Sequence, residues 1–157
     1  YAAQVEALVA DMNGTIDQLE AEVESAPSLD ATKRYATDRV AARRAFVAGL
    51  SGLEPPEEAA DLHETALEIM DRLAQAEARL ADRVAELTTN VGIDGIWSTP
   101  EGIAAREADT AAIALCQSAQ STFDETSVRA ELGDVPWVPP EMKEVVIVTF
   151  GCLAEDR

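Results

Sequence analysis

Three arginines that lie close together in an otherwise acidic chain are the residues best suited to chemistry. Arg39, Arg43 and Arg44 fall within two turns of a predicted helix. Guanidinium groups bind carboxylates and phosphates through paired hydrogen bonds, so this group could bind an anionic ligand. Tyr35, one turn earlier, and His63 are the other side chains that we include in such a site. The interpretation that the sequence favours is simpler: the arginines neutralise the acidic segment before them.

His63 is the single histidine of the chain, and no metal-binding or catalytic motif surrounds it. The zinc motif H-E-x-x-H fails because position 67 is leucine, and the di-iron motif E-x-x-H fails because position 60 is alanine. The chain also lacks a P-loop, a G-x-G-x-x-G loop and a G-x-S-x-G elbow. We therefore expect no metal, no cofactor and no catalytic residue, and we regard enzymatic activity as the less favoured hypothesis.

Composition indicates one all-helical domain. The 157 residues include 30 acids and 12 bases, which give a formal charge of −18 and a pI near 4.2. This charge argues against nucleic-acid binding, which needs clustered lysine and arginine. Hydrophobic residues make up 47% of the chain, 29 of them are alanines, and only 4% of the residues are aromatic. Such a composition is typical of helices that pack closely side by side.

Apolar residues recur every three or four positions in four long segments, and this spacing predicts four main helices. The segments are 2–25, about 28–49, 56–90 and 100 to about 123. We expect an up-down bundle of these helices over residues 1–128. A proline-rich extended strap and a short C-terminal helix should follow over residues 129–157. Asn13-Gly14 should weaken the first helix without breaking it.

Local signals place the helix ends. Ser28 or Asp30 can cap the second helix, and Pro56 is suited to the first position of the third. Ser98 and Glu101 form a capping-box pattern before the fourth helix, with Pro100 in its first turn. Residues 92–99 should form a loop.

Charge is distributed unevenly along the chain. Residues 1–30 hold seven acids and no base, whereas residues 31–53 hold five bases and one acid. A short turn joins the two segments, so their helices should be antiparallel neighbours with opposite charges. Exposed ion pairs stabilise a fold only slightly, and we therefore expect this pattern to select the neighbour more than to add stability.

The cysteines and the chain ends leave two possibilities open. Cys116 and Cys152 fit neither a redox nor a zinc motif, so they form either a structural disulfide or two separate buried thiols. No apolar run is long enough to span a bilayer. Because the chain begins at Tyr1 without a methionine, we expect that any leader or lipid-anchored segment was removed upstream.

Residues 50–63, LSGLEPPEEAADLH, and the opening YAAQVE resemble segments of uncharacterised exported or lipoprotein-type helical proteins of actinobacteria. In those proteins an L-x-x-L-x-P-P turn precedes a long helix with a histidine near its start. The resemblance implies an all-helical fold and a location outside the cytoplasm, in the cell envelope or secreted. It implies no activity and no catalytic residue. The late cysteines are similar too, which favours a Cys116–Cys152 disulfide.

Three hypotheses for function follow. The first is a non-enzymatic cell-envelope protein that binds a partner or small ligand, or has a structural role. The second is a receptor or enzyme for an anionic small molecule that uses Arg39, Arg43 and Arg44 with Tyr35 or His63. The third is a coiled-coil assembly module, because the first and third helices have narrow apolar seams that could pair between chains. We expect the chain to be a monomer or a homodimer.

Overall fold

The computed structural model describes residues 1–90 and 92–126, and this part of the chain is all-helical. Its helices are α1 (Ala2–Ser25), α2 (Leu29–Ser51), a 3-10 turn η1 (Glu57–Ala59), α3 (Ala60–Ala85), α4 (Gly92–Ile96) and α5 (Pro100–Thr126). The prediction of an all-α bundle with four main helices is confirmed. The strap and C-terminal helix predicted for residues 129–157 lie outside the described residues.

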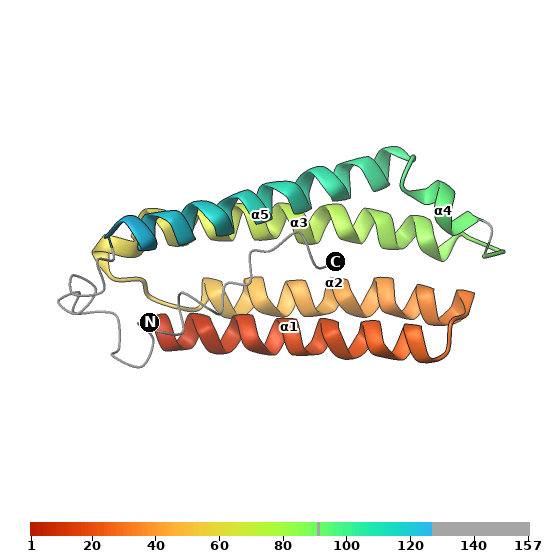
Figure 1. Ribbon diagram of the computed structural model, residues 1–157, viewed down its shortest axis with the longest axis horizontal. Coiled ribbons are helices and arrows are strands. Elements are labelled where there is room, and N and C mark those ends of the chain that lie inside the picture. The colour runs from red at the N-terminus through yellow and green to blue at the C-terminus, as the bar shows by residue number, and fades with distance from the viewer. Residues whose placement is uncertain (91, 127–157) are drawn as a thin grey trace.

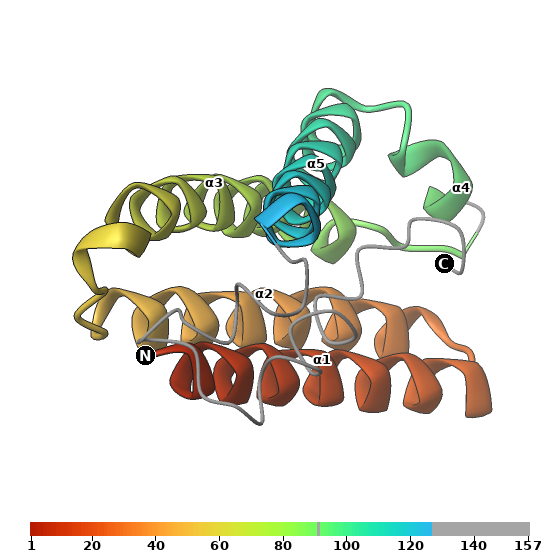
Figure 2. The same ribbon diagram turned by 60° about the vertical axis from the view of Figure 1, so that its left-hand side comes forward.

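The four long helices pack in sequence order. α1 lies along α2, α2 along α3, and α3 against α5, so the predicted pairing of the acidic and basic helices is confirmed. Figure 1 shows α1 beside α2 below and α3 with α5 above, and Figure 2 shows α5 crossing α3 obliquely. Over the described residues, the two outer helices α1 and α5 have little contact with each other. The bundle is therefore a series of neighbouring pairs.

Two apolar clusters hold these pairs together. The larger one joins α1, α2 and α3, and its buried members are Met12, Ile16, Phe46 and Leu50. The smaller one joins α3 to α5 through Leu73, Ala76 and Ala108. Alanine at the α3–α5 contact lets the two backbones approach closely, as the alanine-rich composition predicts.

Capping groups fix the start of two helices. Ser28 caps α2, because its hydroxyl accepts a hydrogen bond from the backbone N–H of Ala31 at 3.1 Å. At α5 the cap is Thr99, whose hydroxyl accepts from the N–H of Gly102 at 3.2 Å. The predicted Ser98 cap was therefore one residue too early, since Pro100 takes the first helical position and Thr99 precedes it.

The third helix is shorter than predicted at both ends. Pro56 is extended, with ψ of 158°, and precedes the 3-10 turn instead of starting the helix. At the other end α3 stops at Ala85, before Thr88 and Thr89, whose branched side chains are poor helix formers. The predicted loop at 92–99 contains the short helix α4, and backbone hydrogen bonds from Gly92 and Ile93 to Thr89 and Asn90 start it.

The corner between α4 and α5 is tightly packed around Gly102. A Cβ atom at this position would clash with the backbone carbonyl oxygen of Ile96 and would lie 2.7 Å from Cα of Trp97. Arg106 adds a hydrogen bond of 2.8 Å to the carbonyl oxygen of Trp97. The close approach of α5 to α4 therefore needs glycine at position 102.

We predict that Gly102→Ala destabilises the protein by about 1–3 kcal/mol, because the methyl group must push two backbone segments apart. Gly14→Ala is the matched control, since it lies in an exposed part of α1 with no atom within 4 Å of a new Cβ. That change should stabilise by about 0.5–1 kcal/mol, because alanine is the better helix former. Urea denaturation followed by circular dichroism measures both, and equal effects of the two changes would contradict the assigned packing.

Candidate functional site

Two of the three predicted arginines point into the bundle. Arg39 and Arg43 are four residues apart on α2 and therefore share one face of it. Arg43 is buried, with 7% of its surface exposed, and the side chain of Arg39 is 24% exposed. Arg44 is exposed and lies on another side of the helix. The structure thus divides the predicted arginine group into an inward pair and an outward single residue.

The inward pair meets a carboxylate of α3. Glu77 Oε1 lies 3.0 Å from Arg39 Nε, and Glu77 Oε2 lies 3.5 Å from Arg43 Nε. Glu77 is itself buried, with 9% of its surface exposed. Arg39 Nε, Arg43 Nε and Glu77 Oε2 make these contacts outside hydrogen-bond geometry, so charge attraction is what holds them. We expected Arg39 and Arg43 to neutralise the first helix, but they pair with the third.

Tyr35 links this ion pair to α1. Arg39 Nη1 donates a hydrogen bond of 2.8 Å to the Tyr35 hydroxyl, and that hydroxyl donates one of 2.9 Å to Glu20 Oε1 on α1. Arg43 Nη1 also contacts Met12 Sδ of α1 at 3.5 Å. A continuous polar network therefore joins α1, α2 and α3 through Glu20, Tyr35, Arg39, Glu77 and Arg43, and we call it the buried ionic network.

The surroundings shift two pKa values in this network. Burial by itself would lower the pKa of Arg39, but attraction to Glu77, Tyr35 and Asp109 outweighs burial and raises it. Burial is also the main reason why the pKa of Tyr35 is raised, although Arg39 opposes the shift. Asp109 belongs to α5, so the field at Arg39 includes a charge from the outermost helix. The arginine stays cationic and the tyrosine stays neutral at ordinary pH.

Sequence reasoning missed Glu77, the carboxylate with which Arg39 and Arg43 form their ion pairs. The signal was present, because Glu77 lies four residues after Leu73 and three before Leu80, within the apolar seam of α3. An acid at such a position faces the core and needs a cation there. Charge sums taken helix by helix pair α1 with α2 and leave α3 out.

His63 lies elsewhere in the fold. It is buried in the first turns of α3, about 20 Å along the helix from Glu77 at 1.5 Å per residue. Its Nδ1 atom is 2.8 Å from the hydroxyl of Tyr1, and the two rings meet edge to face with centroids 5.7 Å apart. Burial raises the pKa of Tyr1. The structure therefore brings Tyr35, Arg39 and Arg43 together and leaves His63 and Arg44 outside the group.

Other chemistry in the described residues is sparse. An open surface depression of about 480 Å³ lies between the end of α3 and the start of α5. It is lined by Arg79, Asp82, Arg83, Glu86, Thr99, Pro100 and Glu101. Arg83 is already paired with Glu86 there. Residues 1–90 and 92–126 contain no cluster of side chains able to hold a metal ion.

Two further predictions concern the membrane and the cysteines. None of the helices within the described residues has the length and apolar character needed to cross a bilayer, as expected. Cys116 belongs to α5, but Cys152 lies outside the described residues. The predicted disulfide therefore stays a prediction.

The chain matches no protein family, no curated protein and no solved structure. The resemblance to actinobacterial exported proteins thus rests on the sequence segments given above.

We predict that Glu77→Gln destabilises the protein by about 3 kcal/mol or more, because it leaves buried guanidinium groups without their counter-charge. The control is Glu68→Gln, which removes an exposed pair with Arg72 on the same helix. That control should cost less than about 1 kcal/mol. Denaturant unfolding distinguishes the two, and similar costs for both substitutions would contradict a buried role for Glu77.

Alkaline pH should weaken the buried ionic network through Tyr35. Because its pKa is raised in the folded protein, the stabilisation from its proton is complete below the unfolded value of about 10 and is lost as pH rises through the folded value. Tyr35→Phe removes this contribution, so its free energy of unfolding should fall less than that of the parent above about pH 10. Urea titrations at neutral and alkaline pH, with phenolate absorbance as the monitor, measure the difference. If the free energy of unfolding falls equally in both proteins at alkaline pH, the Tyr35 hydroxyl does not contribute to the pH dependence of stability.

Proposed function

We propose that this chain is a non-enzymatic helical-bundle protein of the cell envelope that acts through contact of its outer surface with a partner protein. The position of Glu77 between Arg39 and Arg43 is the observation that carries the proposal. An anionic ligand would need that position, and the protein's own carboxylate occupies it. Arg39 and Arg43 are therefore engaged within the bundle, and Arg44 is the member of the predicted group that faces outward.

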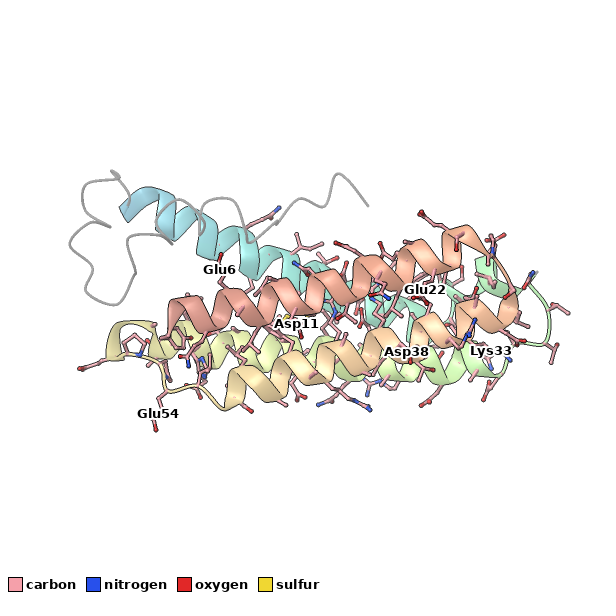
Figure 3. The ribbon with its side chains drawn as sticks, turned by 90° about the horizontal axis from the view of Figure 1, so that it is seen from below. Glu6, Asp11, Glu22, Lys33, Asp38 and Glu54 are labelled. Atoms are coloured by element: carbon pink, nitrogen blue, oxygen red, sulfur yellow. The ribbon has the colours of Figure 1, made fainter. Side chains whose placement is uncertain are left out.

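The outer face of α1 supports a partner that carries basic groups. α1 holds six acids and no base, and Asp11, Asp17, Glu22 and Glu24 are exposed. Figure 3 shows Glu6, Asp11 and Glu22 placed along this helix. Together with the net charge of −18, these carboxylates would attract a positively charged surface and speed its encounter.

The envelope location is proposed from the resemblance of residues 50–63 to exported helical proteins. A Cys116–Cys152 disulfide would agree with an oxidising compartment. Comparison of intact mass with and without reductant tests the disulfide, and fractionation of cells that make the protein tests the location.

The two other hypotheses for function predict different outcomes in measurements of melting temperature and of oligomeric state. A receptor or enzyme for an anionic small molecule would show a melting temperature that rises with phosphate or a carboxylate and that depends on Arg39. A coiled-coil assembly module would form dimers or larger species in light scattering, with exposed apolar side chains such as Leu62 at the contact.

A photo-crosslinking residue in place of Asp17, in the full-length protein within its native cells, should form a discrete adduct with a basic partner. The same residue at Ala41, which is exposed on α2, is the control and should give little adduct. Raised salt should weaken the Asp17 adduct, because exposed charges are screened. No adduct from Asp17, or equal adducts from both positions, would count against the proposal.

A further inference from the structure

We infer that Glu77 determines the register between α2 and α3, and that the apolar seams alone leave this register open to a shift by one helical turn. This register is a property of the fold and does not depend on what the outer surface binds.

The apolar contacts between these helices distinguish poorly between neighbouring registers. Met70, Leu73, Leu80 and Val84 of α3 follow a spacing of three or four positions, in which Glu77 fills the step between Leu73 and Leu80. In the apolar cluster that these helices share, α3 contributes Ala66, Leu67 and Met70, and α2 contributes Ala42, Phe46, Val47 and Leu50. A shift of one turn, about 5.4 Å, therefore places one apolar or small residue where another was.

The contact of Glu77 with the two arginines does distinguish between neighbouring registers of α2 and α3. Arg39 and Arg43 are separated by one turn of α2, and the two oxygens of Glu77 contact one arginine each. Among the residues that the described part of α3 buries, Glu77 is the one acid. A shift by one turn in either direction would bring an apolar residue to the arginines and would leave buried guanidinium groups without this carboxylate.

Further contacts of Arg39 strengthen the preference for one register. Arg39 is also fixed by the Tyr35 hydroxyl, which is bonded to Glu20 of α1. Contacts with α1 and α2 thus fix the position of the Arg39 side chain. The register of α3 must then place the Glu77 carboxylate beside it. A single polar group within an apolar helix interface is known to fix register in this way.

The test measures register directly with two spin labels, one at Arg34 on α2 and one at Glu64 on α3, both exposed. The labels are attached through noncanonical amino acids, so Cys116 and Cys152 stay unchanged. The parent protein should give one narrow distance distribution.

The first variant moves the carboxylate by one turn and keeps the composition: Glu77→Ala with Ala81→Glu. If Glu77 determines register, the label distance should shift by several ångströms, toward the change of about 5.4 Å that one turn produces. A folded protein with the parent distance would overturn the inference, because apolar packing would then be sufficient.

The second variant removes the charges: Arg39→Met, Arg43→Met and Glu77→Leu. It should stay folded, with a melting temperature near or above that of the parent, but with a broadened or double distance distribution. The control Arg72→Met with Glu68→Leu removes an exposed pair and should keep one narrow distance. A single unchanged distance, or loss of folding in the charge-free variant, would each overturn the inference, the latter by showing a role in stability instead of register.

Discussion

The attraction between one buried carboxylate and two guanidinium groups, one buried and one partly buried, is the interaction on which the rest of this structure depends. Removal of charged groups from water is costly, and the cost is offset only when opposite charges meet with good geometry. Glu77 meets Arg39 and Arg43 where α2 and α3 pack. The positions of α1, through Glu20 and Tyr35, and of α5, through Asp109, are consistent with the same requirement.

Most of the fold follows from local sequence signals. Ser28 and Pro100 mark helix starts because capping and the fixed φ of proline are properties of a few consecutive residues. The apolar spacing predicts which faces turn inward, and Ile16 and Leu73 are among the most buried side chains. The errors occur where local signals compete, as at Pro56 and at the end of α3.

The candidate site was only half predictable. Tyr35, Arg39 and Arg43 were recognised as a group because they are neighbours on one helix. Their partner was not, because Glu77 is distant in sequence and an acid is normally assigned to a solvated face. Charge sums for whole helices gave the correct neighbour for α1 but the wrong partner for the arginines. Position within the seam, not net charge, decides where an individual charge lies.

The packing of helices in sequence order has a kinetic consequence. Over the described residues, α1, α2, α3 and α5 each contact mainly the next long helix in the chain, so most contacts between helices join consecutive long helices. Helical bundles whose contacts join consecutive elements have low contact order, and they close small loops at each step and fold rapidly. The α1–α2 pair, which a short turn joins, is a natural starting point, and each later helix can add to a surface that already exists.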